Sequence, residues 1–169
     1  MKKFTEIKPE EFNKSPFQMI GKDWMLITAQ KGEQVNTMTA SWGGLGVMWG
    51  KNVAFTVIRP QRYTKEFVDN ADTFSLTVMD SSYKKQLSYI GSVSGRDEDK
   101  ISKCNLTVQY QDNTPYFEEG NIVLLCRKLY AQVFQPECFI AAELDKEWYP
   151  HKDHHTMYIS EVKKILIKE

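Results

Sequence analysis

The sequence predicts a mainly β protein, built as an antiparallel barrel or sandwich with a few short helices. About seven segments are β-branched or alternate between apolar and polar residues, and turn residues separate them at close spacing. Long helices do not alternate with these strands, which disfavours a doubly wound α/β sheet. No repeat, low-complexity tract or linker divides the 169 residues, so we expect one domain over residues 1–169.

In the first half of the chain, proline and glycine mark the boundaries of the elements. A short helix is expected over 9–12, because Pro9 suits a first helical turn. Strands are expected over 24–29 and 35–42, and Gly43-Gly44 ends the second of them. The clearest strand covers 52–59 and ends before Pro60, and a short helix follows over 64–70.

In the second half, strands are expected over 73–79, 106–110, 121–134 and 155–167. Helices are expected over 82–90 and 97–103, the latter with Ser94 as N-cap and Asp97 completing a capping box. The alternation of the last strand slips near Glu161, which indicates a β-bulge.

Charge and cysteine content narrow the function classes. The formal net charge is +0, with 22 Lys+Arg and 22 Asp+Glu, so binding to nucleic acid or to a membrane surface through bulk charge is disfavoured. The N-terminal lysines are not followed by the apolar region of a signal peptide, and the aliphatic stretch 122–125 is too short to span a bilayer. The three cysteines are an odd number without a CxxC pair. We therefore expect a cytoplasmic protein.

One predicted strand carries an unusual run of small and hydroxyl side chains, Asn36-Thr37-Met38-Thr39-Ala40-Ser41-Trp42, which leads into Gly43-Gly44. Short hydroxyls lose little entropy when fixed, and glycine permits close approach, so a planar ligand with a polar edge suits this strand. The residue types alone favour an ordinary edge strand whose threonines face water.

Two corners have the chemistry of an anion site. In Arg59-Pro60-Gln61-Arg62-Tyr63-Thr64, the two arginines flank a helix start with Thr64 as its expected N-cap. An exposed turn with weak surface ion pairs is an equal alternative. In the second corner, Ser94, Arg96 and Lys100 surround a helix start, but three acidic residues over 97–99 compete with an anion, so a capped helix with a solvated face is at least as well supported.

Metal and nucleotide motifs are missing. His154 and His155 are adjacent, so on a strand they point to opposite faces, and neither CxxC nor HExxH accompanies them. We expect no metal site, and one histidine facing a cleft. GxSxG, GxxxxGK[ST] and GxGxxG are also absent from the sequence.

Four stretches, taken in order, resemble the flavin reductase-like family of FMN-binding split-barrel proteins, which includes flavoredoxin. They are residues 36–42, 59–64, 89–100 and 154–159, so the resemblance covers nearly the whole chain. Ile90 stands where many relatives have cysteine. The resemblance implies a six-stranded antiparallel Greek-key split barrel, non-covalently bound FMN, and a homodimer with flavin sites near the subunit interface.

The resemblance also implies roles for residues. The isoalloxazine edge would lie along the strand closest to Thr39, Ala40 and Ser41, and cations and hydroxyls of the two corners would reach the ribityl phosphate. His155 becomes a contact for nicotinamide or substrate, and no catalytic acid or nucleophile is assigned. The implied FMN-binding residues are Asn36, Thr37, Met38, Thr39, Ala40, Ser41, Trp42, Arg59, Arg62, Tyr63, Thr64, Ser94, Arg96 and Lys100.

The implied activity is an oxidoreductase that takes hydride from NAD(P)H onto FMN and passes electrons to a flavin or a small acceptor. Such chemistry belongs to the cofactor, while the protein binds and orients it. One alternative is an FMN-binding electron carrier with no NAD(P)H activity of its own. A third, weaker alternative is a pyridoxamine-phosphate-oxidase-like or haem-binding relative on a similar barrel.

Overall fold

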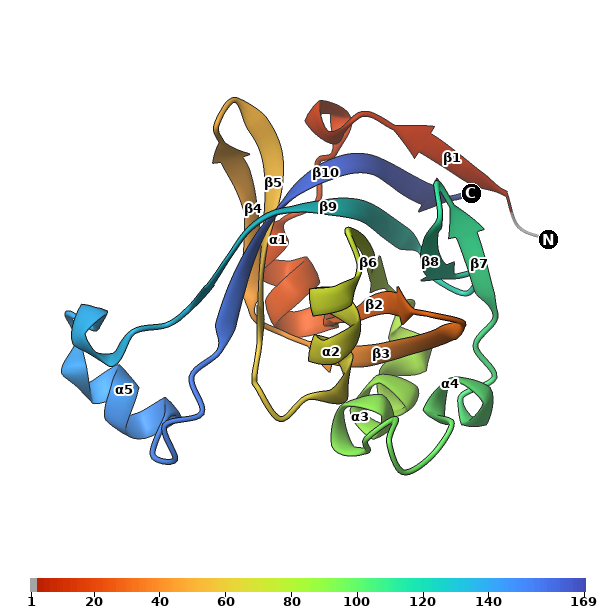
Figure 1. The fold of residues 1–169 in the computed structure, drawn as a ribbon. Coiled ribbons are helices and arrows are strands. Elements are labelled where there is room, and N and C mark those ends of the chain that lie inside the picture. The colour runs from red at the N-terminus through yellow and green to blue at the C-terminus, as the bar shows by residue number, and fades with distance from the viewer. Residues whose placement is uncertain (1–2) are drawn as a thin grey trace.

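A computed structural model describes residues 3–169. Residues 1 and 2 lie outside the described residues; they belong to the predicted domain and to the N-terminal stretch that was expected not to be a signal peptide. Strands dominate the structure (Figure 1). The strands are β1 (Phe4–Ile7), β2 (Met25–Lys31), β3 (Gln34–Ala40), β4 (Gly43–Met48), β5 (Lys51–Ile58), β6 (Thr73–Val78), β7 (Val108–Gln111), β8 (Thr114–Phe117), β9 (Ile122–Val133) and β10 (Thr156–Lys168). The α-helices are α1 (Pro16–Gln18), α2 (Tyr63–Asn70), α3 (Lys84–Ser92), α4 (Lys100–Lys103) and α5 (Ala142–Trp148).

Short helical turns complete the elements. Three of them are 3-10 turns, which cover Pro9–Glu11, Ser81–Tyr83 and Pro136–Cys138. The fourth is a π-helical turn over Met19–Asp23, shortly before β2.

Eight strands form one sheet in the order β3-β2-β6-β9-β10-β5-β4, with β1 added beside β10. All the strand pairs are antiparallel, and β7 and β8 form a separate two-stranded sheet. The mainly β antiparallel class is confirmed, although the main sheet has eight strands where six were expected. Register shifts between Ile159 and Ser160 and between Val162 and Lys164 flank Glu161, as the predicted bulge requires.

Strand β2 is buried on both of its faces, which fixes the position of its neighbour β3. One face belongs to the main core, where Ile27 packs with residues such as Phe67 of α2. The other face packs under α3, where Leu26 meets Leu87 and Ile90. Each fully buried side chain of this size contributes about 1.5–3 kcal/mol relative to exposure.

The two predicted helix caps are wrong. Helix α2 starts one residue early, with Arg62 at the N-cap, and Thr64 is buried inside its first turn. Helix α4 starts only at Lys100, because the Asp99 side chain accepts a hydrogen bond from the Ser102 N–H at 3.1 Å and so provides the N-cap.

Strands β9 and β10 extend past the rest of the sheet and carry the segment 134–155 at their far end (Figure 1). The Phe134 N–H donates to the His155 carbonyl at 2.9 Å and closes the base of this excursion. Helix α5 lies within it and has no buried residue. None of the helices in residues 3–169 has the length and hydropathy that a membrane crossing requires.

Candidate functional site

Two hollows open along strand β3. We call the first the cationic hollow; its volume is about 400 Å³, and its lining includes Asn36, Tyr63, Gly95, Arg96 and Lys100 together with the acidic residues Glu98 and Asp99. We call the second the aromatic hollow; its volume is about 270 Å³. It is lined by Met38, Thr39, Ala40, Ser41, Trp42, Val57, Arg59, Trp148 and His155. At roughly 3.3 Å per residue, Asn36 and Ala40 are about 13 Å apart along the strand, so one elongated ligand can reach both hollows.

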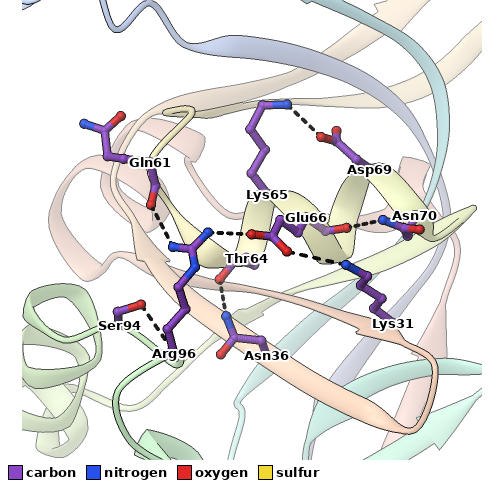
Figure 2. Close-up of polar contacts among 10 residues, drawn as sticks. All are labelled: Lys31, Asn36, Gln61, Thr64, Lys65, Glu66, Asp69, Asn70, Ser94 and Arg96. Atoms are coloured by element: carbon purple, nitrogen blue, oxygen red, sulfur yellow. Dashed lines mark hydrogen bonds and ion pairs between the residues drawn. The ribbon is translucent and has the colours of Figure 1, made fainter.

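The cationic hollow forms where the two predicted anion corners meet (Figure 2). The Asn36 side chain donates from Nδ2 to Thr64 Oγ1 at 3.0 Å, which joins β3 to α2. The loop before α4 passes so close that a Cβ on Gly95 would lie 2.2 Å from Asn36 Oδ1. Only glycine permits this approach. Residues far apart in the chain therefore surround one space.

Two cations, Lys100 in the lining of this hollow and Arg62 close to Lys100 but outside the lining, form no ion pair with a carboxylate among the described residues. Lys100 is 3% exposed, and its Nζ donates to the carbonyls of Ile90 at 3.0 Å and Val93 at 3.1 Å. Arg62 donates from Nη1 to the Gly91 carbonyl at 2.9 Å. The ion pairs among residues 3–169 include neither side chain. Carbonyl oxygens are thus the hydrogen-bond partners of both charges, and Glu98 adds a smaller electrostatic attraction on Lys100.

Burial changes the acidity of both groups. It lowers the pKa of Lys100 from 10.5 to about 8, with repulsion from Arg62 as the second cause. Burial also lowers the pKa of Arg62. A bound anion would reverse this effect, because an opposite charge favours the protonated form.

Arg96 differs from these two cations because its charge is already compensated. Its Nη2 donates to Glu66 Oε1 at 2.5 Å and its Nη1 donates to the Gln61 carbonyl (Figure 2). Its guanidinium also lies 4.5 Å from the centre of the Tyr63 ring. The hydrogen bond from Arg96 is the main cause that lowers the pKa of Glu66. Ser94 Oγ accepts the Arg96 N–H at 3.2 Å, so it shapes the loop.

The aromatic hollow is walled by Trp42 and Trp148. The Trp42 ring lies edge to face with Trp148 at 4.9 Å between centroids and tilted against His155 at 5.0 Å. Trp42 is 37% exposed and Trp148 is 43% exposed, so both retain surface for a ligand. Their contact brings helix α5 of the excursion against the start of β4.

Arg59 was expected beside Arg62 in an anion corner, but the structure places it at the aromatic hollow. It donates from Nη1 to Asp153 Oδ2 at 2.5 Å and from Nη2 to the Trp148 carbonyl at 2.7 Å. Hydrogen bonds from Gln61 and then Arg59 lower the pKa of Asp153 to about 2. Arg59 therefore ties the excursion to β5.

Two threonine hydroxyls of β3 are used inside the protein. Thr37 is fully buried, donates to the Ile27 carbonyl at 3.0 Å and lies 2.9 Å from Thr28 Oγ1. Thr39 donates to the Leu87 carbonyl at 2.5 Å. The groups left for a ligand are the exposed Ser41 and the backbone of β3, which is an edge strand of the sheet.

The two adjacent histidines make separate contacts. His155 Nδ1 lies 2.7 Å from the Tyr149 hydroxyl, and His154 Nε2 lies 2.6 Å from Asp145 Oδ1. No group of three or more His, Cys, Asp or Glu within residues 3–169 has the arrangement of a metal site. Trp148 and Tyr149 were not among the predicted site residues; their position just before the histidines is a signal that could have pointed to them.

A larger hollow of about 830 Å³ lies beside the π-helical turn and has several lysines in its wall. Lys84 is already occupied there: its Nζ donates to the Lys22 carbonyl and lies 3.4 Å from the centre of the Trp24 ring. Several residues singled out from the sequence line the two hollows along β3, and none of them lines this one.

Comparisons with known proteins identify a family and a fold. The family model described as flavin reductase like domain matches residues 18–169. No curated protein matches the sequence.

Solved structures share the fold. An FMN-binding domain of a flavin reductases-like enzyme from Shewanella baltica has a TM-score of 0.72 and 15% identity, over 99% of this chain and 78% of its own. A flavoredoxin from Methanosarcina acetivorans has a TM-score of 0.68 and 20% identity, over 87% and 69%. An FMN-binding protein from Thermus thermophilus, solved with p-hydroxybenzaldehyde, has a TM-score of 0.69 and 18% identity, over 96% and 81%.

Proposed function

The chain belongs to the flavin reductase like domain family. From that premise we propose that it is an FMN-dependent oxidoreductase that accepts hydride from NAD(P)H and passes electrons to a flavin or a small acceptor. One observation carries the proposal: among residues 3–169 Lys100 and Arg62 form no ion pair with a carboxylate, and the hollow that Lys100 lines lies at one end of an edge strand whose other end is aromatic.

The cationic hollow fits a phosphate monoester. Lys100 uses two of its three donors on carbonyls and has one left, and the Arg62 guanidinium has further N–H groups beyond its one bond to Gly91. Charge-assisted hydrogen bonds of this kind are about twice as strong as neutral ones. We assign the phosphate to Lys100 and Arg62, with Asn36 beside them and Arg96 in a lesser role because Glu66 already holds it.

The strand between the hollows fits the ring system. FMN supplies the hydride chemistry when it is bound, and the protein's part is to bind and orient it. The β3 backbone over 39–41 offers N–H and carbonyl groups to a polar ring edge, while Trp42 and Trp148 cover the ring site and exclude water. Such a step requires neither a nucleophile nor a general acid from the chain.

The identity of the flavin is tested directly by extraction and chromatography. We expect FMN, because the site offers one phosphate corner and the sequence has no dinucleotide loop. Protein that releases mainly FAD would contradict the assignment.

Anaerobic mixing with NADH and with NADPH tests the activity. We expect the yellow colour of the purified protein to bleach within seconds with at least one of the two donors. If neither donor bleaches it, the chain is an electron carrier that receives electrons from another protein, which is the alternative drawn from the sequence.

We also propose a homodimer in the cytoplasm. Exposed apolar side chains support the dimer: Trp49 in the β4–β5 turn is 58% exposed and lies 6.3 Å from Tyr130 of β9, which is 42% exposed. Large aromatics are enriched in interfaces. Light scattering is expected to give twice 19.7 kDa. The three free cysteines fit a reducing compartment.

A further inference from the structure

The two ring nitrogens of His155 have different surroundings. Nδ1 lies 2.7 Å from the hydroxyl of Tyr149. Nε2 has no hydrogen-bond partner among the described residues, and it is not among their fully buried side-chain atoms without a partner. Since His155 lines the aromatic hollow, Nε2 is the nitrogen available to a ligand.

The Tyr149 hydroxyl acts as the donor in this pair. Burial raises the pKa of Tyr149, so the phenol keeps its proton, and within residues 3–169 His155 Nδ1 is the hydrogen-bond partner of this hydroxyl. Burial, followed by repulsion from Arg59, lowers the pKa of His155 to about 4, so the imidazole is neutral at pH 7. A neutral imidazole that accepts at Nδ1 carries its proton at Nε2.

Tyr149 itself is held in place from several sides. It is 3% exposed, and its ring stacks on His154 with centroids 4.5 Å apart and planes 23° apart. His154 is in turn bound to Asp145 of α5, and the Arg59 guanidinium lies 5.1 Å from the centre of the Tyr149 ring. The hydroxyl therefore meets Nδ1 in one fixed geometry.

We propose that Tyr149 is a positioning residue that fixes His155 as its Nε2–H tautomer, so that the aromatic hollow selects a planar ligand presenting a carbonyl or carboxamide oxygen. The selectivity follows from the tautomer: an Nε2–H group can donate to such an oxygen, whereas a ligand that presents only a donor leaves it unpaired. Taking the ligand to be the nicotinamide of NAD(P)H rests on the proposed function; the tautomer does not.

Nuclear magnetic resonance of the full-length protein, as purified and labelled with ¹⁵N at histidine, tests the tautomer. The wild type is expected to show His155 neutral at pH 7 with the proton on Nε2. In Tyr149→Phe, which keeps the ring packing, the Nδ1 signal is expected to shift as it loses its donor. Tyr158→Phe is the matched control, because it removes another buried phenol hydrogen bond, to Asp69 Oδ1 at 2.6 Å, without touching the hollow.

Anaerobic reduction by NADH and NADPH tests the ligand contact. Tyr149→Phe is expected to raise the half-saturating concentration of the effective donor by roughly twofold to tenfold, the effect of one neutral hydrogen bond, with a smaller change in the limiting rate. Tyr158→Phe is expected to leave this concentration unchanged.

Each outcome decides one part of the proposal. A wild-type His155 protonated at Nδ1 overturns it, and that measurement needs no variant to fold. An Nδ1 signal that is the same in folded Tyr149→Phe, or an unchanged half-saturating concentration, also overturns it. If neither donor reduces the wild type while the tautomer is as expected, the proposed function is wrong and the role of Tyr149 stands.

Discussion

Replacing Lys100 by methionine tests whether its buried charge is kept for an anion. Methionine preserves an unbranched side chain of similar reach and removes the ammonium group. In the flavin-free protein, Lys100 has a pKa of about 8, against 10.5 for the ordinary side chain, and its only partners are the Ile90 and Val93 carbonyls. The charge therefore costs folding free energy until a counter-ion arrives.

The size and sign of the effect follow from the two pKa values. One pKa unit corresponds to about 1.4 kcal/mol, so a shift from 10.5 to about 8 costs the folded state on the order of 3 kcal/mol. Below pH 8 both the folded and the unfolded chain carry the proton, and the cost is fully present. Between pH 8 and 10.5 the folded chain loses its proton first, so stability rises, and above 10.5 the cost is gone.

Urea unfolding of flavin-free protein at pH values from 7 to 10.5 measures this difference. The unfolding free energy of the wild type relative to Lys100→Met is expected to rise by up to about 3 kcal/mol over that range. Lys103→Met on the same helix is the control: Lys103 is exposed and paired with Glu98, and the hydrogen bond to Glu98 raises its pKa. The control is expected not to show the rise.

The same variant tests the phosphate contact. Loss of one charge-assisted hydrogen bond, about 1.5–3 kcal/mol, predicts FMN binding weakened by about tenfold to a hundredfold, with riboflavin binding unchanged. Fluorescence titration with both flavins measures this. If the difference in unfolding free energy between the wild type and Lys100→Met is the same at every pH from 7 to 10.5, Lys100 does not carry an unpaired charge. If Lys100→Met binds FMN as tightly as the wild type, Lys100 does not contact the phosphate.

Three further substitutions test other parts of the site. Arg62→Ala is expected to weaken FMN binding about tenfold to a hundredfold in equilibrium dialysis and to leave riboflavin binding unchanged. Arg96→Ala is expected to weaken FMN binding less, because Glu66 already holds Arg96, and equal losses in the two variants would contradict this role of Glu66. Gly95→Ala places a Cβ 2.2 Å from Asn36 Oδ1, so thermal unfolding is expected to show about 1–3 kcal/mol of destabilisation together with weaker FMN binding, and an unaltered protein would disprove the close approach. Trp49→Asp is expected to shift light scattering toward the monomer mass, and a persistent dimer would place the interface elsewhere.

Strands with alternating or β-branched side chains were predicted from the sequence. Strands whose position depends on the neighbouring strand with which they pair were missed. The strand predicted over 52–59 is β5, Lys51–Ile58. Its neighbour β4, which contains Gly43, Gly44 and Gly46, was missed because Gly43-Gly44 was taken as the end of the preceding strand. These glycines lie against Phe55 of β5: a Cβ on Gly43 would meet the Phe55 carbonyl at 2.3 Å, and one on Gly46 would lie 3.5 Å from its ring. Such a strand is specified by its partner and not by its own pattern.

The candidate site was predictable in its parts and not in its assembly. Both predicted anion corners were singled out from the sequence, but only the tertiary structure shows that Asn36 lies between them and that Arg59 turns away from Arg62 toward Asp153. Residue type could not separate Arg96, which Glu66 neutralises, from Lys100, which has no such partner. The segment 134–155, which supplies Trp148, has no periodic pattern of apolar residues. The sequence therefore did not predict that this segment forms one wall of the aromatic hollow.

The attachment of the excursion has a consequence for the way the molecule opens. Arg59 bonds Asp153 and the Trp148 carbonyl, whereas α5 buries no residue of its own and the sheet below is held by continuous ladders. Segments with few buried contacts open with far less free energy than a cooperative core. Amide protons of 142–148 are therefore expected to exchange with solvent through a local opening that leaves β9 and β10 protected. In that opening Trp148 is expected to withdraw from Trp42, so the aromatic hollow loses one wall while the sheet stays folded.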